Sequence, residues 1–588
     1  MRVSVGQFSE SPHPFAPTTR PEPAAPPKDP SIPQLGFLSA EPATALQSFF
    51  ATVQRIVADN PVATPRLQEL AGKARQGALT PEEAQELQLL KLQALRQGKA
   101  VAAVMGFFLR FKPYPMLEEL RAKGKLFQPA FGPVLVVEGN AVRELLERDQ
   151  EFSVEPYGVE MMKVMSPAHN GGFTTFILST DDNAVYEPDK RLLTSVCTRK
   201  DADTITSLIH QDCRRRVGEA VAAARAAGTS TIDVVQTVAR YVPVTLGHRY
   251  LGVPVAAVPG TFELTPEMLT YYGAPLDGQA PTALSKADGV IPDEAQMYAW
   301  IKAAFQHFFN NVQKDPVVSA QGLRACRQLL AYLLREIGIQ RQRLQSGEGV
   351  NDTMLTRLLR LQLGMPVPGV VPEGLDPRLV SDLRIAENVM GTIVGAVAGQ
   401  EEATCRAIDA LLRLKEGQYA TSGGSQRYGS FDEARRLAVS VLEGADAATS
   451  RTVLYRYAME ALRLEPQGEV LLRKCVKDGA TIAGSRPMTA GTLVFAAHGS
   501  AMKDVPEPGA FMLDRPREHW LTYGWNRHAC LGQHVSPVII VESMVALLGL
   551  EDLQRAGPFQ LDAQNLYAAS FAVQFTDSGT TRRFWPAH

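Results

Sequence analysis

The sequence predicts a mainly α-helical fold with small β-sheets, in the α+β class. Helical periodicity dominates residues 201–415, where segments such as LRACRQLLAYLLREIGIQRQRLQ repeat apolar residues at intervals of three and four. Strand-like patterns are confined to PVLVVEG (Pro133–Gly139), which a helix-like AVRELLERD follows, and to residues after Leu471. We therefore expect a helical middle between two parts that contain strands.

The size and composition of the chain exclude several classes. A chain of 588 residues exceeds the size at which one simple core usually stops growing, so we expect a large catalytic domain with an extension, or two domains. A net charge of −2 leaves no electrostatic footprint for nucleic acid, so we expect no DNA or RNA partner. The six cysteines lie far apart without a C-x-x-C pair, which favours free thiols in a reducing compartment. Because the sequence has neither a signal-peptide pattern nor a run of roughly 18 apolar residues, we expect a soluble, cytoplasmic protein.

The N-terminal part is predicted to lie outside the main domain. Residues 1–35 carry repeated prolines and few residues that could form a core, so we expect a disordered tail. Residues 36–112 are expected to form a helical extension, because Thr80 precedes Pro81 and Glu83 in the pattern of a helix start. The sequence leaves open whether this extension covers the domain, contacts a membrane surface or docks a partner.

One run of this extension, AVAAVMGFF, lies between Lys99 and Arg110. The run is about half as long as a membrane span needs, so we expect a buried helix. A helix that lies in a membrane interface has the same pattern, and membrane contact therefore stays open.

Four motifs follow one another in the last part of the chain. Each motif is weak evidence alone; a single E-x-x-R pair at i and i+3 of a helix, for example, is most often a solvated surface pair. Their joint occurrence in one order carries more weight. The motifs are E-x-x-R with Glu460 and Arg463, R-x-x-x-x-D with Arg473 and Asp478, D-R-P with Arg515, and the loop YGWNRHACLGQH (Tyr523–His534) around Cys530.

In this order, the four motifs resemble those of the cytochrome P450 superfamily, over about residues 113–588. The family's loop signature, aromatic-G-x-G-x-H/R-x-C-x-G, has Asn526 here in place of its second glycine, and asparagine also tolerates left-handed dihedrals. The resemblance implies a soluble, bacterial-type fold in which a haem lies between a long distal helix and a proximal cysteine loop. The matched positions are Tyr523, Gly524, His528, Cys530 and Gly532.

The resemblance implies haem b (iron protoporphyrin IX) as the cofactor and Cys530 as the axial ligand of its iron. A thiolate ligand pushes electron density towards iron in a way that favours O–O cleavage. The apolar VIIVESMVALLGL after the loop predicts a helix whose N-terminus would favour the thiolate, and Pro537 predicts that this helix is kinked or starts late. Tyr523 would pack against the loop, and glycines would let its backbone approach the sulfur.

The two haem propionates need cationic partners if they are buried. By resemblance these are His528, Arg473 and a basic residue of DDNAVYEPDKRLL, where the family commonly has His or Trp followed four residues later by Arg. Here Tyr186 is followed at that distance by Lys190 and then by Arg191. Lysine would act as a point charge without the bidentate fork of arginine. A buried structural triad beneath the haem loop is implied for Glu460, Arg463 and Arg515.

The expected distal helix departs from the family. Monooxygenases of the family carry A-G-x-D/E-T there, an acid–alcohol pair that helps to deliver protons to dioxygen. One register, AGQEE, would put Glu401 at the acid position and Glu402 at the alcohol position. The other, counted back from AIDALL, would put Ala398 and Gly399 there, and neither register retains the pair. The candidate distal residues are Ala398, Gly399, Gln400 and Glu401.

The same helix carries glycines at every fourth position, namely Gly391, Gly395 and Gly399. Each costs about 1 kcal/mol relative to alanine inside a helix, so we expect something to pack closely against that face. Tight helix–helix packing is the alternative explanation.

The resemblance implies a haem-thiolate monooxygenase that oxidises an apolar organic substrate with dioxygen. It would need an external electron donor, a ferredoxin or a flavoprotein, because nothing in the chain resembles a flavin or iron–sulfur domain. The missing acid–alcohol pair leaves other functions open: a peroxide-dependent or hydroperoxide-rearranging enzyme, an oxidative coupling enzyme, or a non-catalytic haem-binding protein. A buried core thiol in a haem-free protein is the structural alternative for Cys530.

Overall fold

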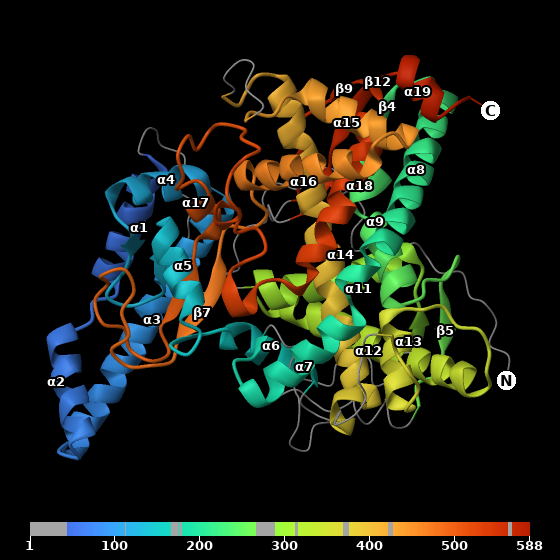
Figure 1. The fold of residues 1–588 in the computed structure, drawn as a ribbon. Coiled ribbons are helices and arrows are strands. Elements are labelled where there is room, and N and C mark those ends of the chain that lie inside the picture. The colour runs from blue at the N-terminus through green and yellow to red at the C-terminus, as the bar shows by residue number, and fades with distance from the viewer. Residues whose placement is uncertain are drawn as a thin grey trace, which may run out of the picture.

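Helices form most of the molecule, and short strands gather into small sheets (Figure 1). The predicted mainly α class with small sheets is therefore confirmed. The predicted tail, residues 1–35, lies outside the described residues. The computed structural model describes residues 44–111, 113–165, 176, 179–265, 289–311, 315–368, 376–420, 427–562 and 567–587.

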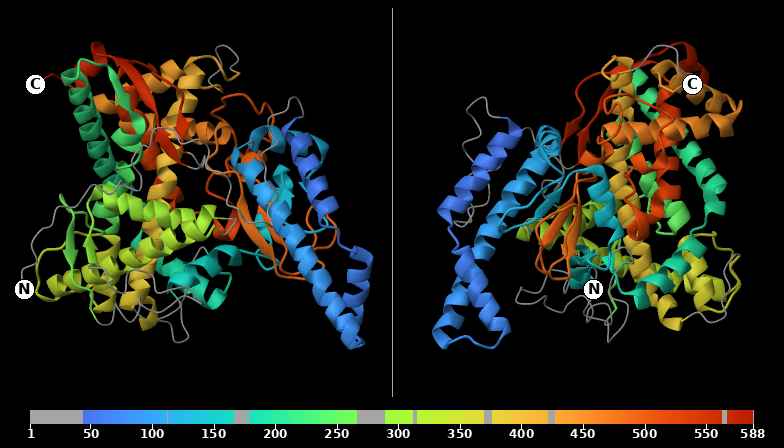
Figure 2. Two further views of the ribbon diagram at one scale, coloured as in Figure 1. Left: turned by 180° about the vertical axis from the view of Figure 1, so that it is seen from behind. Right: turned by 60° about the vertical axis from the view of Figure 1, so that its left-hand side comes forward.

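Four N-terminal helices lie on one side of the molecule (blue in Figures 1 and 2). Thr80 and Glu83 exchange backbone-to-side-chain hydrogen bonds of 3.1 and 3.2 Å, so the predicted helix start is confirmed. The predicted buried run is confirmed as well, because Val101, Met105 and Phe108 are buried. Among the described residues, no helix has the length and apolar character that a membrane crossing requires. The helices are α1 (Ala45–Asp59), α2 (Thr64–Arg75), α3 (Pro81–Phe111) and α4 (Pro113–Lys123).

A five-stranded sheet joins two segments far apart in the sequence, residues 126–153 and 471–496. Its strand order is β1-β2-β8-β7-β3, in which β2 runs parallel to β8 and the other pairs are antiparallel. One apolar core contains residues of α1 and α3 together with Leu135 and Phe495 of this sheet. The predicted boundary at residue 112 stays a prediction. The strands are β1 (Leu126–Phe127), β2 (Val134–Val136), β3 (Phe152–Ser153), β7 (Leu471–Cys475) and β8 (Leu493–Ala496).

The longest helix of the described residues, α14 (Asp382–Lys415), runs through the helical body (Figure 1). Ser381 caps it by accepting a hydrogen bond from the backbone N–H of Arg384. The helix after the cysteine loop, α18 (Ser536–Leu548), carries Pro537 in its first turn. Of the two predicted effects of this proline, a kink or a late start of the helix, the structure shows the late start. Helix α14 packs against α11 (Glu294–Phe305), α12 (Pro316–Gln345), α16 (Ala447–Leu464) and α18.

The remaining elements complete this body. The helices are α5 (Gly139–Glu147), α6 (Glu155–Met165), α7 (Asn183–Val196), α8 (Ala202–Ala226), α9 (Val242–Leu246), α13 (Met354–Gln362), α15 (Phe431–Glu443), α17 (His498–Met502) and α19 (Gly579–Phe584). The short 3-10 and π-helical turns are η3 (Arg199–Asp201), η4 (Val235–Ala239), η5 (Gly247–Leu251), η7 (Gln306–Asn310), η8 (Pro377–Val380), η9 (Arg517–His519), η10 (Asn526–His528) and η11 (Leu531–His534). The strands are β4 (Thr231–Asp233), β5 (Gly260–Phe262), β6 (Gly289–Ile291), β9 (Glu551–Arg555), β10 (Gln560–Leu561), β11 (Ala568–Ser570) and β12 (Ala572–Thr576).

Candidate functional site

The cysteine loop folds back on itself before α18 begins. The backbone N–H of Cys530 donates to the carbonyl of Tyr523 at 2.8 Å, which closes the loop. Gly524 and Asn526 have φ angles of 70° and 59°, in the left-handed region. Asparagine is one of the few non-glycine residues that visits this region routinely, so Asn526 can serve where the family has glycine.

A cavity of about 530 Å³ lies between this loop, α14, α7 and the start of α18, and Cys530 borders it. Burial raises the pKa of the Cys530 thiol, and a hydrogen bond from the backbone N–H of Gly532 offsets part of that rise. A thiol in this position becomes a thiolate once a metal ion coordinates its sulfur.

The cavity wall is apolar and cationic. No Asp or Glu stands among the described residues that border it, whereas Lys190 and Arg527 do. Lys190 donates to the Tyr186 hydroxyl at 2.7 Å and to the Arg527 carbonyl at 3.2 Å. Arg527 pairs one guanidinium nitrogen with Asp149 at 3.1 Å, and its Nε and Nη2 are buried without a hydrogen-bond partner among the residues that the structure describes. The wall therefore suits a largely apolar group that carries carboxylates.

Three predicted propionate contacts do not border the cavity. His528 Nε2 lies 2.8 Å from a carboxylate oxygen of Asp181, in a hydrogen bond that turns it to another partner. The guanidinium of Arg473 is buried and donates to the carbonyl of Leu472 at 2.8 Å. Arg191 lies on the exposed face of α7, whereas Lys190 borders the cavity, and the propionate role of Arg191 stays a prediction.

One of the four candidate distal residues lies on the face that α14 turns to the cavity. Gln400 borders the cavity, but Ala398, Gly399 and Glu401 do not. Glu401 instead accepts a hydrogen bond from Nη2 of Arg240 at 2.9 Å. Burial raises the pKa of Glu401 to about 7 even though this guanidinium lowers it. The other α14 residues at the cavity are Gly391, Thr392, Gly395 and Ala396.

The glycines of α14 serve two purposes. A Cβ on Gly391 would lie 2.4 Å from the ring of Phe176, and one on Gly399 would lie 2.9 Å from the amide of Gln467. Close packing therefore explains these two positions. A Cβ on Gly395 would meet nothing within 4 Å, because this glycine faces the cavity. The sequence did not indicate that Thr392, Ala396 and Arg527 border the cavity. Of the three, only Arg527 carried a signal, namely its positive charge beside His528.

Gln400 connects the distal helix to the cysteine loop. Its Nε2 donates to the Ser536 hydroxyl at 2.5 Å, and that hydroxyl lies 2.9 Å from the hydroxyl of Tyr523. The Oε1 of Gln400 is buried, and no described residue forms a hydrogen bond with it. The amide thus has one acceptor left for a molecule in the cavity.

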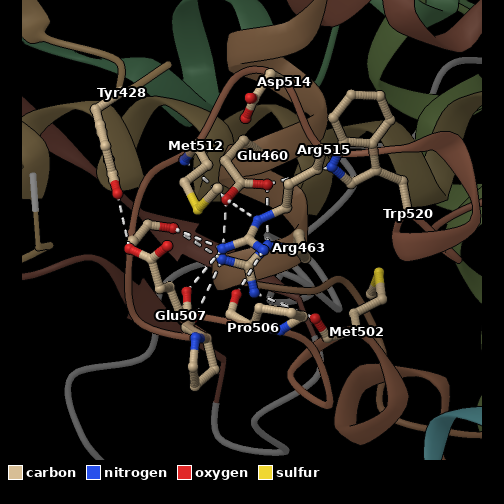
Figure 3. Close-up of polar contacts among 12 residues, drawn as sticks. Tyr428, Glu460, Arg463, Met502, Pro506, Glu507, Met512, Asp514, Arg515 and Trp520 are labelled. Carbon is tan, nitrogen blue, oxygen red and sulfur yellow. Dashed lines mark hydrogen bonds and ion pairs between the residues drawn. The ribbon is translucent and has the colours of Figure 1, made fainter. Parts of the chain in front are cut away.

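Beneath the loop, Glu460 lies between two buried arginines (Figure 3). Its carboxylate accepts hydrogen bonds of 2.9 Å from Arg463 and Arg515 and one of 3.2 Å from Nε1 of Trp520. Arg515 also donates to the carbonyls of Pro506 and Glu507 at 2.8 and 2.7 Å. These bonds join α16 to the chain that leads into the cysteine loop, where the sequence places the structural triad.

Comparisons with known proteins support the fold. No family model matches the chain. A solved structure titled cytochrome P450 CYP109Q5 from Chondromyces apiculatus matches with a TM-score of 0.52 and 16% identity over 80% of this chain and 96% of that one. CYP108D1 from Novosphingobium aromaticivorans matches with a TM-score of 0.54 and 17% identity over 81% and 96%. P450BioI, solved in complex with a hexadec-9Z-enoic acid ligated acyl carrier protein, matches with a TM-score of 0.53 and 14% identity over 80% and 99%.

One curated protein shares sequence with part of the chain. It is described as a bifunctional dioxygenase–epoxy alcohol synthase of Fusarium oxysporum, and it is 30% identical over 128 residues. The match covers 20% of this chain and 9% of that protein, so the chain spans less than a tenth of the length of the relative.

Proposed function

Because the chain has the cytochrome P450 fold, we propose that it binds haem through Cys530 and is a haem-thiolate oxidoreductase. One observation carries the proposal: the Cys530 sulfur borders a cavity under α14 whose described wall contains cations and no carboxylate. A haem is a largely apolar plate with two carboxylates, and this wall matches both properties.

The residues at the cavity fit haem b. Cys530 would hold the iron, and Lys190 and Arg527 would pair with propionates, since two buried guanidinium nitrogens of Arg527 have no hydrogen-bond partner within the described ranges. His528 and Arg473 stay predictions as propionate contacts. When bound, a haem with a thiolate ligand supplies chemistry that cleaves an O–O bond and transfers oxygen.

We infer that the oxidant is an organic hydroperoxide. The polar side chains of α14 at the cavity are Thr392 and Gln400, and the nearest distal carboxylate candidate, Glu401, pairs with Arg240 away from the cavity. A hydroperoxide brings its own O–O bond and proton, so it needs neither an acid–alcohol pair nor external electrons. The free Oε1 of Gln400 can accept a hydrogen bond from the hydroperoxide O–H.

Two further observations support this oxidant. The partial relative is named as an epoxy alcohol synthase joined to a dioxygenase, and a dioxygenase that adds both atoms of O2 without cleaving their bond produces a hydroperoxide. The cavity wall also carries Leu193, Leu246, Leu251 and Met354, which suit an apolar chain. We therefore propose an apolar hydroperoxide as substrate, rearranged or used to oxygenate the same molecule.

Monooxygenation with external electrons is the second candidate. On the outer side of the cysteine loop, a hollow of about 770 Å³ is bordered by two arginines, Arg199 and Arg517, and by two glutamates, Glu147 and Glu518. This hollow of mixed charge lies next to the loop of Cys530, where a ferredoxin or flavoprotein would dock as electron donor.

The first experiment tests the ligand. Reduced protein is exposed to carbon monoxide, and its difference spectrum is compared with that of Cys530→Ala. We expect a thiolate-type Soret shift in the wild type only. If the wild type shows no such shift, Cys530 is not an iron ligand and the proposal is wrong.

The second experiment separates the two oxidants. Purified protein receives a hydroperoxide of an unsaturated fatty acid without any electron donor, or the parent fatty acid with a ferredoxin, its reductase and NADPH. Consumption in the first assay alone supports the hydroperoxide proposal. Oxidation in the second assay alone supports the monooxygenase, and no turnover in either favours a non-catalytic haem protein.

A further inference from the structure

The N-terminal extension turns a row of leucines to solvent. Helices α2 and α3 form a hairpin that projects from the rest of the described chain (Figures 1 and 2). Apolar side chains of the two helices pack together on the inner side of this hairpin. On the outer side of α3, Leu89, Leu92 and Leu95 are 56%, 53% and 54% exposed. A contiguous row of large apolar side chains at the surface indicates an interaction site.

The leucines belong to a longer row of exposed residues, which we call the Leu92 stripe. At 3.6 residues per turn, its members fall within about one third of the circumference of α3. The members are Gln85, Gln88, Leu89, Leu92, Leu95, Arg96 and Lys99. The stripe is therefore neutral and polar at its N-terminal end, apolar in the middle and positive at its C-terminal end.

The apolar middle of the stripe is complementary to itself. A two-fold axis at Leu92 would place this residue against its own copy on a second chain that runs antiparallel. Leu89 and Leu95 lie at equal distances on either side of Leu92 in the sequence. Leu89 would therefore face the partner's Leu95, and Leu95 the partner's Leu89. Contacts of this isologous kind are the commonest way in which soluble proteins form dimers.

The polar ends of the stripe favour the same antiparallel arrangement. Arg96 would face the partner's Gln88, and Lys99 would face the partner's Gln85, so that no two cations meet. Glu82 lies about one turn before Gln85, which brings the partner's Glu82 within reach of Lys99. In a parallel pair, Arg96 and Lys99 would each face their own copy instead, and like charges at short distance repel each other.

These charges are not engaged within the hairpin, whereas neighbouring ones are. Glu83 lies 2.7 Å from Nζ of Lys73, and Glu86 lies 2.7 Å from Nη2 of Arg66. Within the part of the chain that the structure describes, Glu82 and the two cations of the stripe form no ion pair. A second copy of the hairpin would supply partners to both ends of the stripe.

We propose that the Leu92 stripe joins two copies of this chain in an antiparallel pair with its two-fold axis at Leu92. A membrane surface matches the stripe less well, because Gln85 and Gln88 would enter the interface with the leucines and Glu82 would face anionic lipid. The stripe has few residues, so the dimer is expected to be weak and to depend on concentration. This contact is independent of the proposed haem chemistry.

Sedimentation velocity of the full chain tests the pair. Between about 1 and 100 µM, the wild type should shift from monomer towards dimer. Leu92→Arg places two cations opposite each other on the axis and should weaken association at least about tenfold. Val258→Arg is the matched control and should dimerise like the wild type. Val258 is 74% exposed and precedes β5, a strand that lies far from α2 and α3 in Figure 1.

Engineered cysteines test the register. Under mild oxidation, Leu92→Cys should form a cross-linked dimer, because its two copies meet on the axis. Leu95→Cys alone should not, since its copies would lie about six residues, roughly 9 Å, apart along the helices, beyond the reach of a disulfide. Leu95→Cys mixed with Leu89→Cys should cross-link again. The wild type, which has no cysteine in the stripe, is the control.

Three results would overturn the proposal. The first is a wild type that stays monomeric over this concentration range, and the second is a Leu92→Arg variant that dimerises as well as the wild type. The third is cross-linking of Leu95→Cys alone but not of Leu92→Cys, which would contradict the two-fold axis. If a monomeric wild type sediments with vesicles of phosphatidylglycerol, the stripe contacts a membrane instead.

Discussion

The triad beneath the cysteine loop and the cavity above it contain polar groups in opposite states. At Glu460, both carboxylate oxygens accept hydrogen bonds from buried donors. At the cavity, Oε1 of Gln400 and two nitrogens of Arg527 are buried without hydrogen-bond partners in the described part of the chain. Buried polar groups are normally paired, so a satisfied group indicates a structural role and an unsatisfied one indicates a place for a ligand.

Breaking the satisfied region should have the largest effect. Glu460→Gln leaves Arg463 and Arg515 buried without a counter-charge, and loss of one partner of a buried ion pair costs about 3–5 kcal/mol. We expect a corresponding fall in the free energy of unfolding, measured by urea denaturation and circular dichroism. The exposed Glu69→Gln is the control and should leave the midpoint unchanged. If the urea midpoint of Glu460→Gln equals that of wild type, the triad does not stabilise the fold.

Changing the unsatisfied region should reduce turnover and spare stability. Gln400→Leu removes the only amide that α14 turns to the cavity among the described residues. Because a buried hydrogen bond is worth about 1–3 kcal/mol where its partner is left unpaired, we expect kcat/KM with a hydroperoxide to fall about 10- to 100-fold. The Soret spectrum should be retained.

Ser536→Ala provides the contrast to this variant. It removes the hydrogen-bond partner of Gln400 but keeps the amide itself, so we expect a smaller loss of kcat/KM. If both variants lose the same activity, Gln400 acts only by holding the start of α18.

The pair of Glu401 and Arg240 on the distal helix should affect stability but not turnover. Burial raises the pKa of Glu401 to about 7, above its unfolded value of 4.5. The folded protein therefore retains a proton that the unfolded chain releases, and stability falls as pH rises from about 4.5 through about 7, by roughly 1.4 kcal/mol per unit at most. Well above the folded pKa this contribution is constant.

Glu401→Gln should flatten that slope, as measured by urea denaturation at pH 5, 6 and 7. The same variant should keep hydroperoxide turnover within about twofold of wild type, because Glu401 does not border the cavity. If Glu401→Gln loses as much turnover as Gln400→Leu, Glu401 takes part in the reaction.

The smallest effect is expected in the loop backbone. Asn526→Gly should change the free energy of unfolding by less than about 1 kcal/mol, because glycine also adopts φ of 59°. Asn526→Val should cost about 1–2 kcal/mol, since a β-branched residue is strained there. Both are measured by thermal unfolding of the haem-loaded protein, and equal values for the two variants would show that the loop adopts another conformation.

The sequence predicted the parts that depend on neighbours in the chain. The helical periodicity indicated the fold class, and Thr80 with Glu83 indicated a helix start that the hydrogen bonds confirm. It left the face of α14 open, because each shift of one residue turns a helix by about 100°. Two registers were therefore compatible with the same residues, and only the tertiary structure shows that Gly395 and Ala396 border the cavity.

By itself, the sequence determined the loop of Cys530, whose closing hydrogen bond and left-handed residues lie within eight positions of one another. Only the tertiary structure decided that Glu401 pairs with Arg240, 161 residues away, and that Asp181 meets His528, 347 residues away. Local geometry follows from the dihedral preferences of adjacent residues. The partners of a buried charge are set by which helices and strands pack together, and a one-dimensional pattern does not contain that information.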